Sequence, residues 1–142
     1  MQEWALWALA SAVFAALTAI FAKVGLEGVD SNFATFIRTL VIAAALILFL
    51  TYAKKWQPLS ELGARNWVFL TLSGLATGAS WLAYFKALQM GSASQIAPID
   101  KLSVVLVVVF AVIFLGERPS AREWIGIALI ASGVFTLVFA NK

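Results

Sequence analysis

Five apolar stretches, separated only by short connectors, make up almost the whole of this chain of 142 residues. Each is close to the roughly 20 residues that an α-helix needs to cross about 30 Å of hydrocarbon. The helices are expected at about 4–25, 33–53, 67–88, 96–115 and 121–140. No connector is long enough to hold a soluble domain. The sequence therefore predicts an all-α integral membrane protein, with five transmembrane helices in a single domain that spans residues 1–142.

The composition supports a membrane protein and argues against an enzyme. Hydrophobic residues make up 63% of the chain and charged residues 12%, whereas about a quarter of the residues in a soluble domain are charged. A net charge of +3 is ordinary for a membrane protein, so we expect no nucleic-acid partner. The chain has no cysteine and no histidine, which removes the commonest general base and the usual soft metal ligands. We therefore expect no catalytic residues, no metal site and no cofactor.

Tryptophan and the solvated cations predict the orientation in the membrane. Five of the six tryptophans fall at helix ends on one side, where they would form half of an aromatic belt: Trp4, Trp7, Trp56, Trp67 and Trp124. The basic residues that can reach water lie on that same side: Lys54, Lys55, Arg65, Arg118 and Arg122. By the positive-inside rule we expect a cytoplasmic N-terminus, in the inner (plasma) membrane of a bacterium. The cations within the other half of the membrane nearly cancel this bias, so dual topology stays open.

Sequence signals for helix ends agree with these boundaries. Asp30, Ser31 and Asn32 are three candidate N-caps for the second helix. Ser120 and Glu123 have the spacing of a capping box at the start of the last helix. Pro98 is expected in the first turn of the fourth helix, where its missing N–H costs little.

Ionisable residues at membrane depth are costly and by default mark a pathway or a site. Five of them are expected at similar depths in one half of the bilayer: Lys23, Arg38, Lys86, Asp100 and Lys101. Lys23 and Lys86 are long enough to snorkel to the interface, so a structural role stays open for them. Asp100 is short and must be paired or protonated. We expect Lys86 to be its partner, because neighbouring residues on a helix point about 100° apart and Lys101 would face elsewhere.

An aromatic stripe lies close to these charges. Trp81 is the one tryptophan far from a helix end, and Tyr84 and Phe85 follow it at helical spacing. Such a stripe is typical of packing, but beside buried charges it also fits the wall of a cavity in which Trp81 or Tyr84 supplies a hydrogen bond. The residues predicted to bind substrate are Arg38, Trp81, Tyr84, Lys86, Asp100 and Lys101. Asp100, the only acid well inside a helix, is also the candidate for ion coupling.

The chain resembles a known family in three segments. Residues 25–38 (GLEGVDSNFATFIR) are similar to the first loop and second helix of the EamA family, which belongs to the drug/metabolite transporter superfamily. Residues 98–103 (PIDKLS), 115–120 (LGERPS) and 124–126 (WIG) are similar to its fourth and fifth helices. The resemblance implies a transporter. Most members carry two inverted five-helix repeats, whereas this chain has one, which implies an antiparallel homodimer or a second small subunit.

Three functions follow from these observations. The first is a secondary transporter, acting as an exporter, for a small polar or anionic metabolite, with the cationic excess favouring a carboxylate or phosphate. A second is a flippase subunit for lipid-linked sugar phosphates, in which the basic cluster would hold a phosphate headgroup. A third is a membrane partner subunit that transports nothing. The expected partners are a small-molecule substrate, membrane lipid and a second copy of the chain.

Overall fold

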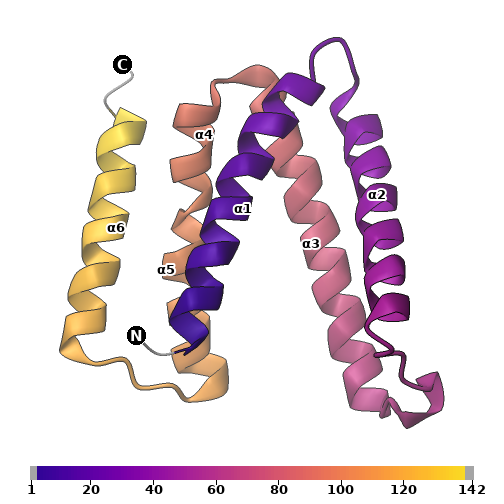
Figure 1. Ribbon diagram of the computed structural model, residues 1–142. Coiled ribbons are helices and arrows are strands. Elements are labelled where there is room, and N and C mark those ends of the chain that lie inside the picture. Colours follow the sequence, from indigo (N-terminus) through magenta and orange to yellow (C-terminus); the bar gives the residue numbers. More distant parts are fainter. Residues whose placement is uncertain (1–2, 140–142) are drawn as a thin grey trace. The chain divides into compact units, whose positions relative to one another are not determined.

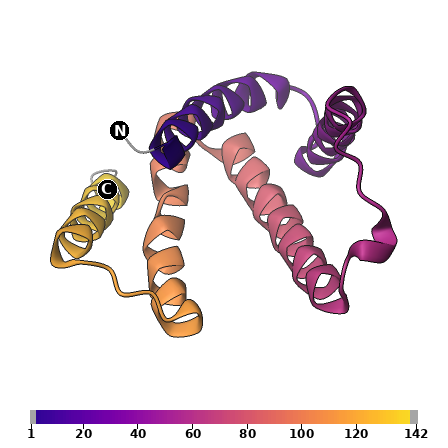
Figure 2. The ribbon, with the colours of Figure 1, turned by 60° about the horizontal axis from the view of Figure 1, so that its bottom comes forward.

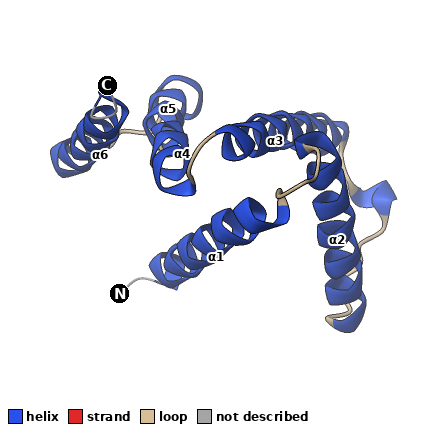
Figure 3. Ribbon diagram, turned by 90° about the horizontal axis from the view of Figure 1, so that it is seen from above, coloured by secondary structure: helices blue, strands red, loops and turns tan. Residues whose placement is uncertain are grey.

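The computed structural model describes residues 3–139, and every regular element in that range is helical (Figures 1 and 3). The elements are α1 (Glu3–Gly25), α2 (Ser31–Tyr52), the short 3₁₀ helix η1 (Leu59–Glu61), α3 (Ala64–Met90), α4 (Ala93–Asp100), α5 (Leu102–Phe110), the π-helical turn η2 (Ala111–Leu115) and α6 (Ala121–Phe139). The all-helical fold class is thereby confirmed.

Within residues 3–139, five segments are long and apolar enough to cross a membrane. They are Glu3–Gly25, Ser31–Tyr52, Ala64–Met90, Ala93–Leu115 and Ala121–Phe139. Large apolar side chains cover their outer surfaces; Leu48 is 71% exposed and Leu129 is 67% exposed. In a bilayer such side chains contact lipid tails or another subunit, so their exposure costs nothing comparable to exposure in water.

The chain divides into two compact units, which are described one at a time. One unit comprises residues 20–90, and the other comprises residues 3–19 together with 91–139 of the described chain. The continuous helix α1 contributes its last turns to the first unit and its earlier turns to the second.

In residues 20–90, α2 packs against α3, with a small core at one end of the pair. The core side chains come from the loop after α1, the start of α2 and the end of α3: Leu26, Ser31, Thr35, Phe85 and Leu88. Among the three candidate N-caps, Asp30 is the cap of α2. Its Oδ1 accepts hydrogen bonds from the backbone N–H groups of Asn32 at 2.9 Å and Phe33 at 3.1 Å.

In the other unit, α6 packs beside α4 and α5 (Figure 2). Ala111 and Val134 are its buried apolar contacts on η2 and α6. The predicted capping box is confirmed: the Ser120 backbone N–H donates to Glu123 Oε2 at 2.6 Å, and the Glu123 N–H donates back to Ser120 Oγ at 3.4 Å. These bonds satisfy N–H groups that have no partner within the helix.

The fourth membrane segment differs from the predicted single helix at 96–115. It begins three residues earlier, at Ala93, and is interrupted at Lys101. Pro98 therefore lies inside α4 rather than in its first turn. Because proline has no N–H, it cannot donate to the carbonyl four residues before it, and the helix is weakened there. The break follows within one turn: Lys101 N–H bonds to Pro98 O at 3.0 Å, a tighter 3₁₀-type contact.

The segment then ends in the turn around Gly116. This glycine has φ +68°, in the left-handed region that favours glycine, and the following Glu117 N–H donates to Ala111 O at 3.2 Å. Those two features close η2 and direct the chain toward α6.

Candidate functional site

The clearest grouping of predicted site residues lies in the unit of residues 20–90 and is centred on Arg38. Arg38 is about 10 Å along α2 from the first residue of this helix, at 1.5 Å per residue. Its guanidinium carbon Cζ lies 4.3 Å from the ring centroid of Trp81 and 5.1 Å from that of Phe85. Both distances are within the range of a cation–π contact. We call Trp81 and Phe85 the aromatic shelf.

The sequence of α3 places the shelf. Trp81 and Phe85 are four residues apart, so they lie on one face of the helix, one turn above the other. Phe85 is only 3% exposed and fixes this face against α2, whereas Trp81 is half-buried. Tyr84 packs edge-on against Phe85, with 6.4 Å between the ring centroids. The sequence placed Phe85 in the aromatic stripe near the buried charges, but Phe85 was not among the residues predicted to bind substrate.

Arg38 uses its positive charge without using its hydrogen-bond donors. A guanidinium carries five N–H groups in one plane and can never accept a hydrogen bond. In the part of the chain that the structure describes, Arg38 makes neither an ion pair nor a side-chain hydrogen bond, and its protein contacts are with aromatic rings. A half-buried arginine of this kind is suited to hold a carboxylate or phosphate.

Lys86 does not join this face of α3. It follows Phe85 directly, which turns its side chain about 100° around the helix, and it is exposed. Within this unit the structure therefore brings together Arg38, Trp81 and Phe85. Tyr84 lies beside Phe85, and Lys86 lies on another face of α3.

Asp100 and Lys101 belong to the other unit and form an ion pair with each other. Lys101 Nζ lies 3.4 Å from Asp100 Oδ2, with the lysine side chain 54% and the aspartate side chain 39% exposed. The expectation that Lys101 faces elsewhere was wrong, because it assumed a continuous helix. Asp100 is instead the last residue of α4, and Lys101 sits in the break with ψ −6°. An additional pairing of Asp100 with Lys86 stays a prediction.

Lys23 has a structural partner. Its Nζ donates to the backbone carbonyl of Leu88 at 2.6 Å, and nearby Gln89 Nε2 donates to the carbonyl of Val29 at 3.0 Å. Leu88 lies in the last turn of α3, where carbonyls lack partners within the helix. Lys23 and Gln89 also line a depression of about 350 Å³ together with the 26–28 loop. The sequence left open whether Lys23 has a structural or a functional role, and the structure gives it a contact with the end of α3.

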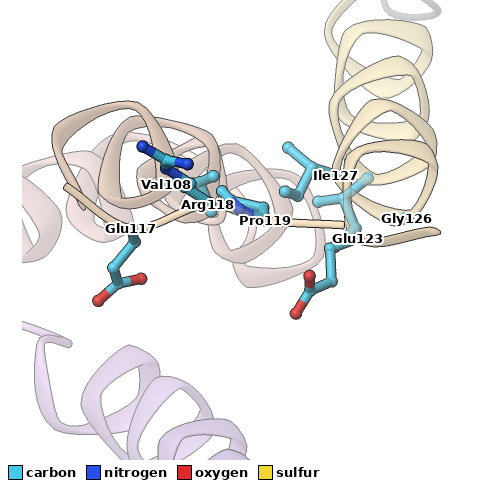
Figure 4. Close-up of a pocket in the computed structure, with 8 residues that line it drawn as sticks. Val108, Glu117, Arg118, Pro119, Glu123, Gly126 and Ile127 are labelled. Atoms are coloured by element: carbon cyan, nitrogen blue, oxygen red, sulfur yellow. The ribbon is translucent and has the colours of Figure 1, made fainter. Parts of the chain in front are cut away.

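A groove of about 420 Å³ lies at the α5–α6 turn, and the predicted site residues do not line it. Its aliphatic wall comes from Val108, Ile127 and Ile130, and its rim from the charged turn. Figure 4 shows the side chains of Glu117 and Glu123 extending to the same side, while Arg118 points away from them. The Glu123 carboxylate is already engaged by Ser120 in the capping box.

No metal centre is built by the residues the structure describes. Among residues 3–139 there is no group of three or more histidine, cysteine, aspartate or glutamate side chains placed to hold an ion.

Comparison with known proteins agrees with the helical arrangement. The model of the EamA-like transporter family matches residues 2–139. An uncharacterized transporter encoded beside cobO in Sinorhizobium sp. is 54% identical over 136 residues, which cover 96% of each chain. An uncharacterized transporter of Bacillus subtilis, YxxF, is 29% identical over 135 residues; these cover 94% of this chain but only 42% of the relative. No solved structure matches.

Proposed function

Because this chain belongs to the EamA-like transporter family, we propose that it is a secondary transporter that exports a small polar or anionic metabolite. The solute binds at Arg38 in the unit of residues 20–90, with Trp81 and Tyr84 nearby and Lys86 adding positive charge to that unit. In the other unit, Asp100 and Lys101 supply the remaining charged groups of the transport mechanism. Asp100 carries the coupling proton. The working assembly is an antiparallel dimer.

Arg38 is the observation that carries this proposal. An arginine inside an apolar helix is expensive unless a specific interaction compensates it. The cation–π contacts to Trp81 and Phe85 supply part of that compensation, and they leave the guanidinium N–H groups unused by the described chain. An anionic group on the solute would complete it. The cation-binding alternative fits poorly, because a positive solute would be repelled by Arg38.

The break in the fourth membrane segment supports a transport role for Asp100 and Lys101. In many secondary transporters the substrate and coupling-ion sites are built where a membrane helix is discontinuous, because the unwound backbone and the helix ends offer polar groups there. Here the interruption falls at the ion pair itself, between α4 and α5. A carboxylate that is partly exposed at such a break has access to protons.

A binding screen tests the substrate class. Purified protein in detergent is titrated with anionic, zwitterionic and cationic metabolites by calorimetry or thermal shift, and the screen is repeated on Arg38→Lys. Losing one partner of a charge-assisted pair typically costs about 2–5 kcal/mol of binding, so the anions should bind markedly more weakly to the variant. If only cations bind, or if Arg38→Lys binds its anion as well as the natural chain does, the anion proposal fails.

Two observations support the antiparallel dimer: the odd number of membrane segments among the described residues, and the greater length of the Bacillus relative. With five membrane segments between residues 3 and 139, the start of α1 and the end of α6 fall on opposite sides of the membrane. Alternating access in such folds uses two inverted repeats around one site. The matched residues of the Bacillus relative are less than half of its length, which leaves room for a second repeat in that protein, whereas this chain supplies one.

The chain contains no cysteine, so its topology can be read from single introduced cysteines. Glu3 and Glu27 are both exposed; Glu3 begins α1, and Glu27 lies in the loop just after its other end. In intact cells a membrane-impermeant thiol reagent should label part of the Glu3→Cys protein and part of the Glu27→Cys protein. Complete labelling at one position and none at the other, for a protein purified without a partner, would rule out the antiparallel homodimer.

A further inference from the structure

We propose that Trp81 and Phe85 are positioning residues that hold the Arg38 guanidinium so that its N–H edge meets an oxyanion of the solute, a carboxylate or a phosphate. The inference rests on the proposed function and deepens it by assigning a role to the aromatic shelf. In this account Trp81 acts on the solute through Arg38, and its indole N–H is not the recognition group.

The geometry of the shelf carries this role. An arginine side chain is long and loses much of its rotamer freedom when it is fixed for binding. Two rings at 4.3 and 5.1 Å from Cζ restrict the guanidinium before the solute arrives. Phe85 is itself almost fully buried, so the shelf has little freedom to move. A pre-organised donor loses less entropy on binding, and affinity rises accordingly.

The cation–π contacts leave the N–H groups of the Arg38 guanidinium available for a solute. A cation–π contact is made with the π face of a ring and consumes none of the five guanidinium N–H groups. Those groups lie in one plane and match the two oxygens of a carboxylate or phosphate in a bidentate pair. A carboxylate partner for Arg38 within the protein would have occupied the same edge. The described chain supplies rings in its place.

The competing explanation is that the shelf serves only to fasten α2 to α3. Under that explanation Trp81 and Phe85 affect stability, and any loss of binding follows the loss of folded protein. The two explanations separate when binding is measured on protein that remains folded, and when the effect of Trp81 is compared with and without Arg38.

The test uses calorimetric titration of the purified full chain with succinate and with inorganic phosphate, alongside choline as a cationic probe. Trp81→Leu removes the ring, and Trp81→Phe retains one. Because Trp81 is half-buried, we expect Trp81→Leu to bind the anions roughly 5- to 30-fold more weakly, the range between an exposed and a desolvated cation–π contact. Trp81→Phe should stay within about threefold of the natural chain. Phe85→Leu supplies an independent second variant if Trp81→Leu does not fold.

The chain offers a matched control on the same helix. Arg65 Cζ lies 5.9 Å from the ring of Phe69, a second cation–π pair on α3, near the opposite end of this helix from Trp81. Phe69→Leu removes the same kind of contact and should leave the affinity for both anions unchanged. A loss of affinity in Phe69→Leu as large as in Trp81→Leu would contradict a local role for the shelf.

A double variant decides between positioning and direct contact. If Trp81 acts through Arg38, then Trp81→Leu combined with Arg38→Lys binds no more weakly than Arg38→Lys alone. Additive losses would mean that Trp81 touches the solute itself, which overturns the positioning role. Unchanged anion binding by folded Trp81→Leu would also overturn the positioning role. If the natural chain binds neither anion, or Arg38→Lys binds both unchanged, the proposed anion site fails first, which is a different result from failure of the shelf alone.

Discussion

Lys23 Nζ donates a hydrogen bond of 2.6 Å to the backbone carbonyl of Leu88, and so joins the end of α1 to the last turn of α3. The two residues are 65 positions apart in the chain, and Leu88 is fully buried. The contact places a positive charge at the C-terminal end of a helix, where the helix dipole favours it. It gives Lys23 a role in stability that is separate from the Arg38 site.

Lys23→Met is therefore expected to destabilise the protein. The substitution keeps the apolar stem but removes a charged donor from a carbonyl in the last turn of α3, a loss of about 1–3 kcal/mol. Thermal unfolding in detergent should show a lower midpoint, while the anion affinity of the folded protein stays the same. Lys55→Met removes an equal charge from an exposed loop and should leave the midpoint unchanged. An unchanged midpoint in Lys23→Met would contradict the structural role.

Lys54→Gly is expected to stabilise the protein. Lys54 has φ +52°, the left-handed conformation that a residue with a Cβ adopts only at a cost, and it stands where many helices end in glycine. The turn is otherwise well bonded, because Lys55 N–H donates to Leu50 O at 3.0 Å. The gain should be about 0.5–1 kcal/mol. Lys55→Gly removes the same charge one residue later without relieving strain and should not stabilise; equal midpoints for the two variants would refute the argument.

Asp100→Asn is expected to abolish transport driven by a proton gradient while exchange of solute across the membrane persists. The amide cannot take up or release a proton, but it keeps the shape and part of the hydrogen bonding of the carboxyl group. The comparison variant is Lys101→Gln, which removes the ion-pair partner and keeps the carboxyl group of Asp100. Gradient-driven transport in liposomes should survive in Lys101→Gln. If both variants lose gradient-driven transport, Asp100 serves as a static partner of Lys101. If both variants keep it, Asp100 does not carry the proton.

The membrane architecture could be predicted from the sequence because it depends on local features. Apolar length fixes the five segments, and short-range hydrogen bonding fixes their ends, as at Asp30 and in the Ser120–Glu123 box. The interruption at Lys101 could not be predicted in the same way. Its position depends on where the helix before Pro98 begins. A start at residue 96 would place the proline in the first turn, whereas the observed start at Ala93 places it inside the helix.

The candidate site was only partly predictable for a related reason. Depth in the membrane follows from counting residues, which is why Arg38 and Trp81 were expected near each other. Which side chains meet depends on the rotation of α3 against α2, and that rotation is set by buried contacts such as Phe85 and Leu88. The sequence therefore placed the aromatic stripe near Arg38 but could not show which of its rings contact the guanidinium. It also predicted a partner for Asp100 other than Lys101.

Solute exchange in reconstituted liposomes tests the central claim most directly. Vesicles that contain the purified protein and are loaded with unlabelled succinate or phosphate, whichever binds, are placed in the same anion carrying a radioactive label. The account predicts uptake of label by the natural chain and by Phe69→Leu, little uptake by Arg38→Lys, and no competition by choline. Uptake that is absent with every anion in the binding screen, or that is undiminished in Arg38→Lys, would contradict a transporter whose anion site is built on Arg38.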